Sequence, residues 1–190
     1  MATGFRETVR VLLAGLGTVI ALPALVIADW GRLDEGFILG GQALALVPGV
    51  IGDAARAAFY ARTLALFEPG AAVRFGSYFS KRGARVHAGA GIGAYCVIGL
   101  ADLGPRVRIA SRVSITSGLH YHGSAARGVE DRDVVERVTI GANTWIGEGA
   151  VIGADVGANC IVGMGSVVIQ PVPDGSTVMG NPARRIPTAA

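Results

Sequence analysis

The sequence predicts a mainly β protein, a parallel β-helix of hexapeptide repeats behind an N-terminal helical and apolar appendage. Branched aliphatic residues recur every six positions, with one four-residue step, at Ile140, Ile146, Ile152, Val156, Val162 and Val168. Six is neither a helix period nor a simple strand period. A repeat this short, with Gly frequent after the aliphatic residue, is typical of a parallel β-helix.

The residue four places after each aliphatic supports this interpretation, because an inward corner of a coil leaves room only for a compact side chain. These positions hold Thr144, Ala150, Val156, Cys160 and Ser166. Gly supplies the positive φ that tight corners need. A flexible Gly-rich linker would be polar and would lack the regular aliphatic step, so we exclude it.

The same repeat is predicted over residues 86–118. Val86, Ile92 and Ile98 lie six apart, and Val107 and Val113 resume the period after a three-residue insertion. The segment 119–137 is too polar to form coils of the β-helix and is predicted to be a loop that projects from its side. We therefore expect an apolar and helical segment over 1–70, and a β-helix domain over 71–190 that carries the loop 119–137 and a C-terminal tail.

Composition narrows the function classes. The net charge of the 190 residues is +3 without a basic run, which argues against nucleic acid as a partner. Half of the residues are apolar, which excludes a disordered chain. Cys96 and Cys160 both occupy compact inward positions, so we expect two buried thiols, compatible with a reducing cytosol.

The N-terminal part holds two apolar runs, 11–28 and 37–51. Residues 11–28 carry no charge and follow Arg6 and Arg10. We favour an interfacial or re-entrant membrane hairpin, the alternative being two helices packed on the end of the β-helix or on another subunit. Residues 53–67 read as an amphipathic helix, N-capped by Asp53 and with Arg56 off its apolar face, that covers the open end of the coil.

The candidate chemistry lies at the loop. Of three histidines, His120 and His122 stand where the loop leaves the coil. A neutral imidazole is the natural general base near pH 7. Composition alone leaves open that these are ordinary surface histidines. His87 lies inside a repeat and is expected to face solvent. No nucleophile constellation or phosphate-binding loop is present in the sequence.

A resemblance then becomes specific. The segments ITSGLHYHG, IGANTWIGEGAVI, VGMGSVV and GNPARRIP, all within residues 86–187, resemble the hexapeptide-repeat acyltransferases, which include galactoside, maltose and serine acetyltransferases and polysaccharide-cluster O-acetyltransferases. The resemblance implies a left-handed coil and a homotrimer with three sites between neighbouring subunits. It also implies acetyl-CoA (or another acyl-CoA) as co-substrate along the groove between coils, with no metal ion.

The resemblance also implies roles for single residues. His120 is the first choice for the general base and His122 the second. Trp145 would pack near the thioester, and Gly163, Met164 and Ser166 would line the pantetheine groove. Arg184, with help from Arg185, would meet the nucleotide phosphates. Gln170 stands where many relatives carry Lys, and Glu148 replaces a common small residue.

We therefore expect an acetyl-CoA-dependent O-acetyltransferase that acts on a hydroxyl of a sugar, a glycan or a lipid-linked sugar. Its expected location is the cytoplasm, peripheral to or anchored on the inner face of the cytoplasmic membrane. Two alternatives stay open at this point: a metal enzyme like the γ-type carbonic anhydrases, which hold a metal with three histidines, and a non-catalytic scaffold. Transfer to O or to N, and the length of the acyl group, are open as well.

Overall fold

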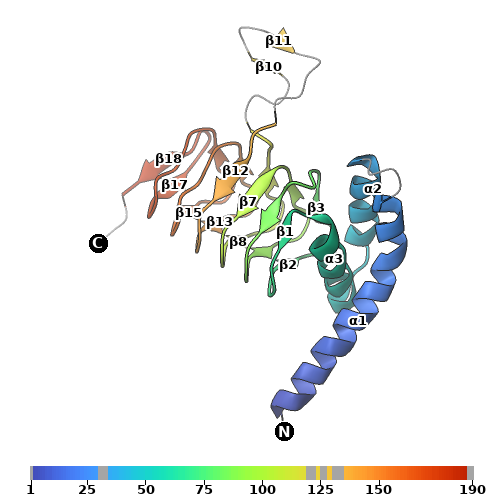
Figure 1. Cartoon of the computed structure of the whole chain (residues 1–190). Helices are drawn as coiled ribbons and strands as arrows, with labels where there is room; N and C mark the ends of the chain where they lie inside the picture. Colours follow the sequence, from blue (N-terminus) through green and yellow to red (C-terminus); the bar gives the residue numbers. More distant parts are fainter. Residues whose placement is uncertain (1, 30–33, 119–122, 125–127, 130–134, 188–190) are drawn as a thin grey trace.

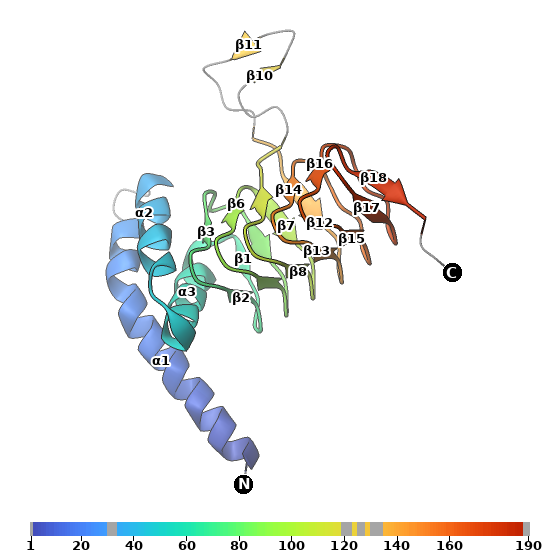
Figure 2. The same cartoon turned by 180° about the vertical axis from the view of Figure 1, so that it is seen from behind.

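Three N-terminal helices precede a β-solenoid of about five turns (Figure 1). The structure is a computed structural model that describes residues 2–29, 34–118, 123–124, 128–129 and 135–187. The helices lie across one end of the solenoid and the C-terminus lies at the other, as the reverse view also shows (Figure 2). The predicted parallel β-helix is confirmed.

Three parallel stacks of short strands form the faces of the coil, here called faces A, B and C. Face A contains β1 (Leu66–Phe67), β4 (Arg85–Val86), β7 (Ala101–Leu103) and β12 (Val138–Ile140). Face B contains β2 (Ala72–Val73), β5 (Gly91–Ile92), β8 (Arg108–Ile109), β13 (Trp145–Ile146), β15 (Ile161–Val162), β17 (Thr177–Met179) and the antiparallel β18 (Arg184–Ile186). Face C contains β3 (Tyr78–Phe79), β6 (Val97–Ile98), β9 (Ser114–Ile115), β14 (Val151–Ile152) and β16 (Val167–Val168).

Each strand sends one branched or aromatic side chain into the lumen, and these side chains stack in register from coil to coil. On face B the column runs Val73, Ile92, Ile109, Ile146, Val162, Val178. All six are at most 5% exposed. Parallel backbone pairing and a continuous apolar column therefore reinforce each other along the axis.

The six-residue period holds at two corners of the coil and fails only at the third. Steps from face A to face B and from B to C are always six residues, as in Phe67, Val73 and Phe79. From face C to face A the step is seven, five, 25, four and four residues in successive coils. We call this corner the C–A edge. It comprises residues 80–84, 99–100, 116–137, 153–155 and 169–171.

The structure corrects the predicted phase in two places. Ile109 and Ile115, rather than Val107 and Val113, occupy the lumen positions of the third coil, although both valines are also buried at its corners. Val156 is a lumen residue that bridges Ile140, and is not a corner residue. The error arose because a valine fits the corner as well as the lumen, so hydrophobicity alone did not fix the phase. The predicted buried thiols are confirmed.

Helices α1 (Ala2–Asp29), α2 (Asp34–Ala45) and α3 (Gly49–Thr63) cover the N-terminal end of the coil. The predicted helix over 53–67 begins earlier and ends at Thr63, and Phe67 lies in β1, so the coil begins before the predicted boundary at residue 71. Tyr60 plugs the lumen: its ring lies 4.9 Å from that of Phe79, and its hydroxyl oxygen accepts a hydrogen bond from the Phe79 amide at 3.3 Å. Burial raises the pKa of Tyr60.

Arg56 holds the cap to the coil, contrary to its predicted place off the apolar face of the helix. It is fully buried and donates to the carbonyl oxygens of Val73 at 2.9 Å, and Leu44 and Val47 at 2.8 Å. It also pairs with Asp53 at 2.7 Å. One guanidinium thus joins the end of α2, the middle of α3 and the first coil. Asp53 is an ion-pair partner inside α3 and not its N-cap.

We expect Arg56→Ala to lower the free energy of unfolding by about 3–5 kcal/mol, because three buried carbonyl groups and Asp53 lose their partner. Chemical denaturation measures this. Arg62→Ala is the matched control, since the exposed Arg62 bonds only to Ala58 of its own helix, and it should cost less than about 1 kcal/mol. Equal effects of the two substitutions would contradict the role assigned to Arg56.

Candidate active site

The C–A edge carries the loop and the two shortest corners of the coil. The third coil continues into the loop after β9, and the two following coils turn this corner with two residues fewer than the regular corners use. Chain length therefore varies at this edge on both sides of the loop.

The root of the loop is tightly held. The Thr116 hydroxyl donates to the Gly118 carbonyl at 2.9 Å, and the Ser117 hydroxyl accepts from the Leu100 amide at 2.9 Å. The returning strand closes the neck, because the Glu136 amide donates to the Ser117 carbonyl at 2.8 Å. Within the loop, β10 (Gly123–Ser124) and β11 (Gly128–Val129) pair antiparallel. His120 and His122 lie outside the described residues. In the sequence, His120 follows Gly118, the last residue of this root, by two positions.

Gly118 is the residue at which the chain leaves the coil. Its φ is +95°, and an added Cβ would lie 2.8 Å from the Cβ of Glu136. Only glycine satisfies both the backbone conformation and the close approach of the returning strand. The direction in which the loop starts therefore depends on this position.

At the C-terminal end of the coil, Arg184 and Arg185 of β18 line a hollow of about 260 Å³ together with Gln170 of the C–A edge and Ser176. From the loop root to Gln170 the edge advances by two coils, which is roughly 10 Å at the usual strand spacing. Both arginines are exposed, and neither forms an ion pair within the described part of the chain. The buried Ser176 hydroxyl has no hydrogen-bond partner there either. The hollow therefore presents two uncompensated positive charges.

Trp145 and Met164 belong to a different surface. Together with neighbours on face B they form an exposed apolar patch of Trp145, Ile161, Met164, Met179 and Ile186, with exposures from 36% to 73%. Trp145 stacks on Ile161 of the next coil, and Thr177 beyond it pairs with Ile186 of β18. We call this surface the face B patch.

Two other predicted cofactor residues lie inside the wall. The buried Ser166 hydroxyl accepts a hydrogen bond from the Gly180 amide at 3.2 Å. Gly163 is also buried, and the Met179 side chain packs 3.0 Å from the place an added Cβ would take. Ser166 and Gly163 flank the exposed Met164. The Ser166 side chain and the Cα of Gly163 both pack against other protein atoms and not against solvent.

A triangular coil places the predicted site residues on two sides. The corner that joins faces C and A lies opposite face B, so the loop root and Trp145 point away from each other across the lumen. The structure thus groups Arg184, Arg185 and Gln170 around the hollow at the C-terminal end of the coil, and groups Trp145 with Met164 on face B. Within one chain, the loop root and the face B patch do not share a cleft.

His87 makes a separate arrangement on face A. Its Nε2 lies 3.0 Å from a carboxylate oxygen of Asp102, and its Nδ1 lies 3.6 Å from Glu68. Its side chain is 31% exposed, as expected of a solvent-facing residue. Over the described ranges, no group of three His, Cys, Asp or Glu side chains could hold a metal ion. The residues that sequence reasoning missed are Asp102, whose partner His87 lies 15 residues away, and Ser176, whose hydroxyl has no partner among the described residues.

The comparisons with known proteins agree with this architecture. Residues 137–170 match the family model described as hexapeptide repeat of succinyl-transferase. The chain is 30% identical over 112 residues to galactoside O-acetyltransferase of Lactococcus lactis, covering 55% of this chain and 54% of that protein. It is 32% identical over 117 residues to galactoside O-acetyltransferase of Escherichia coli, covering 57% and 56%. Over the matched residues, this chain is similar to the hexapeptide-repeat acyltransferases.

The chain spans about half the length of these galactoside relatives. In fold it is also similar to the N-acyltransferase AntD of Bacillus cereus, solved in complex with dTDP and coenzyme A, with a TM-score of 0.54, 15% identity and coverage of 68% of this chain and 79% of that one. At this identity the likeness concerns the fold alone.

We expect Gly118→Ala to lower the free energy of unfolding by about 2–4 kcal/mol, because the substitution adds both left-handed strain and a collision with Glu136. Gly149→Ala is the matched control. Gly149 has φ +69° and open space around an added Cβ, so only the strain of about 1 kcal/mol applies. Denaturant titrations of both variants measure the difference. A Gly118→Ala variant no less stable than Gly149→Ala would contradict the close approach of Gly118 and Glu136 at the base of the loop.

Proposed function

We propose that this chain is an acetyl-CoA-dependent acetyltransferase that transfers the acetyl group to a hydroxyl of a sugar or glycan. The similarity to hexapeptide-repeat acyltransferases supports the reaction class. The observation that carries the site is a shared edge: the root of the loop that bears the two histidines stands on the C–A edge, and the arginine-lined hollow at the C-terminal end of the coil reaches the same edge at Gln170, two coils further on. An acyl-CoA has the same layout, with phosphates at one end and a reactive thioester at the other.

In the proposed reaction, the His120 imidazole, or that of His122, accepts the proton of the acceptor hydroxyl. The oxygen attacks the thioester carbonyl carbon, the carbon–sulfur bond breaks, and the thiolate of CoA takes the proton from the imidazolium. Arg184 and Arg185 attract the phosphates. Gln170 adds no charge there, so the phosphates rely on the two arginines.

We further propose that the complete site forms between copies in a homotrimer. The face B patch lies opposite the loop within one chain, and a neighbouring copy offers the means to bring the two together. Trp145 and Met164 of one copy would then pack beside the thioester that the loop of the next copy attacks. The same contact would cover the exposed apolar side chains of the patch, which favours association.

Sugar hydroxyls are the proposed acceptors because the galactoside relatives are named for them. AntD was solved with dTDP and a related structure of it with a dTDP-linked amino sugar, and both have coenzyme A. Our proposal therefore extends to sugars carried on a nucleotide or a lipid.

Replacing both loop histidines, His120→Ala with His122→Ala, should lower the rate by about 10² to 10⁴-fold, because the general base is lost. The measurement is release of free thiol from acetyl-CoA with a panel of sugars and sugar nucleotides. His87→Gln is the control and should retain the rate. A double variant as active as the unmodified chain would refute the assignment and favour a scaffold or a different chemistry.

A mixing experiment tests the shared site. One variant loses the loop histidines and the other carries Trp145→Glu, so each alone should be inactive. After the two are unfolded and refolded together, about one quarter of the sites in random trimers combine an intact loop with an intact patch. Thiol release should return to that fraction. If loop and patch served the same chain, mixing would restore nothing.

A further inference from the structure

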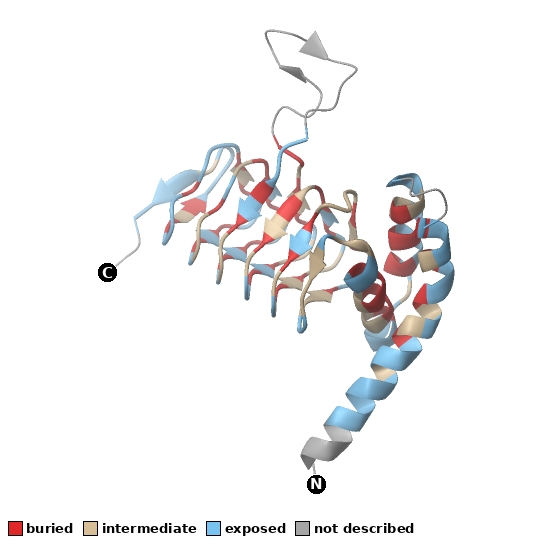
Figure 3. Ribbon diagram, in the orientation of Figure 1, coloured by how far each residue is buried: buried red, intermediate tan, exposed pale blue. Residues whose placement is uncertain are grey.

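Helix α1 turns its small residues toward the protein and its large ones outward. Its buried positions against the other helices are Gly17, Ala21, Ala24 and Ala28. Its opposite side carries exposed aliphatic residues, between 44% and 66% exposed, at Val11, Leu12, Leu16, Val19, Leu22 and Val26. Figure 3 shows the exposed colour along the outer side of the helix. A helix that faces water has the reverse arrangement.

Close packing explains the small side. An added Cβ at Gly17 would lie 2.6 Å from the carbonyl carbon of Ala54, so α1 and α3 approach each other backbone to backbone. Small residues at helix contacts and large aliphatic residues outside are the distribution found where helices meet lipid, because lipid gives no hydrophobic reason to bury the large ones.

The apolar part of the helix has few polar side chains. Residues 11–28 contain one, Thr18, whose hydroxyl donates to the Ala14 carbonyl at 2.9 Å. The segment Glu7–Asp29 has a mean hydropathy of 2.5, and 22% of its apolar stretch is buried. By length and composition this helix is apolar enough to enter a membrane.

We propose that the outer face of α1 lies among the acyl chains of one leaflet of a lipid bilayer, with the helix along the membrane surface. From Gly17 to Ala28 the inner face of α1 packs against the other helices rather than facing water, so this part of the helix needs no polar face of its own. Because α1 lies outermost across the end of the coil (Figures 1 and 2), the β-helix would stand up from the membrane with its C-terminal end farthest away.

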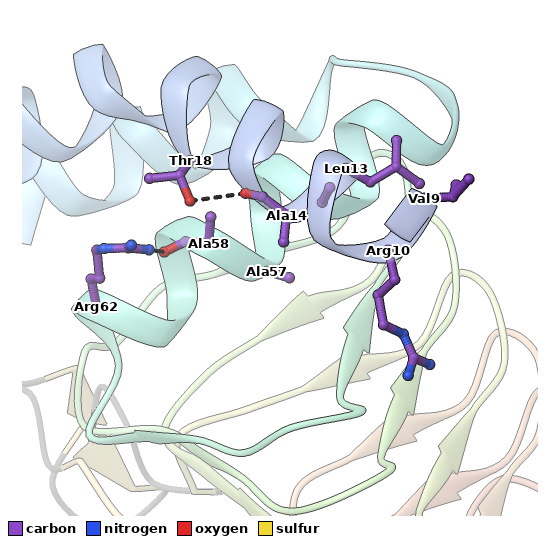
Figure 4. Close-up of a pocket in the computed structure, with 9 residues that line it drawn as sticks. Val9, Arg10, Leu13, Ala14, Thr18, Ala57, Ala58 and Arg62 are labelled. Carbon is purple, nitrogen blue, oxygen red and sulfur yellow. Dashed lines mark hydrogen bonds between the residues drawn. The ribbon is translucent and has the colours of Figure 1, made fainter. Parts of the chain in front are cut away.

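The charges match an anionic surface. Arg10 and Arg62 flank a hollow of about 540 Å³ between α1 and α3, lined otherwise mainly by apolar residues such as Leu13 and Ala57. In Figure 4 the Arg10 side chain extends away from α1, whereas the Arg62 guanidinium bonds to Ala58. With the outer face among acyl chains, Arg10 would lie at headgroup level, where each cation adds binding to anionic lipids.

The test uses the full chain, purified in detergent and mixed with vesicles of phosphatidylcholine with or without phosphatidylglycerol. After detergent removal, the chain should float with both vesicles, more tightly with the anionic ones, and stay bound in high salt. Val19→Asp with Val26→Asp should lower the partition coefficient by about 100-fold or more, since each charge opposes entry into acyl chains. Arg10→Gln should reduce only the anionic preference, by about five-fold.

Val97→Asp with Val151→Asp is the matched control, because both residues are 38% exposed on face C and lie away from α1. This variant should float like the unmodified chain. Flotation lost equally in both double variants overturns the proposal. The proposal is also overturned if the unmodified chain does not bind vesicles and the α1 double variant instead dissociates an oligomer, which would identify a second copy of the chain as the partner.

A mass measurement completes the test. The intact mass of the membrane-bound protein must show that α1 is retained, and its loss also overturns the proposal. None of these results depends on acyl transfer.

Discussion

The structure depends on one constraint: each coil must deliver three lumen side chains directly above those of the coil before. Backbone pairing fixes the vertical spacing, and the branched residues of neighbouring coils must then fit each other inside a narrow space. Two corners meet this requirement with an invariant six-residue step, from Phe67 through Val73 to Phe79 and onward. All variation in length is confined to the C–A edge, where the candidate site is found.

The ends of such a column need their own solution, because a first coil without a cover exposes its backbone and its lumen. Here Tyr60 closes the lumen and Arg56 ties the helices to it through three backbone carbonyls. A single buried charge is stable in this place because each of its three nitrogen atoms donates a hydrogen bond and Asp53 balances it. The same cap supports α1, so the proposed membrane contact is built on the part of the molecule most firmly joined to the coil.

Sequence reasoning recovered the coil because a period can be counted, and it located the loop because polar residues break that period. It did not recover the phase of the third coil, where Val107 and Ile109 are equally apolar, nor the burial of Arg56, whose partners Leu44 and Val73 are remote in sequence. It grouped Trp145 with the loop in a site between subunits. Within one chain the two lie on opposite sides of the lumen, so that grouping stays a prediction. Neither Ser176 nor the backbone role of Ser117 has a local signal, since both depend on which coil lies next.

The uneven corner has an evolutionary consequence. Because faces A, B and C keep their register whatever length of chain is inserted at the C–A edge, this corner can gain or lose residues without repacking the interior. Changes there alter what surrounds an acceptor while leaving the column and its cap intact. Related proteins can therefore come to accept different substrates through changes at the C–A edge alone, while the coil itself stays the same.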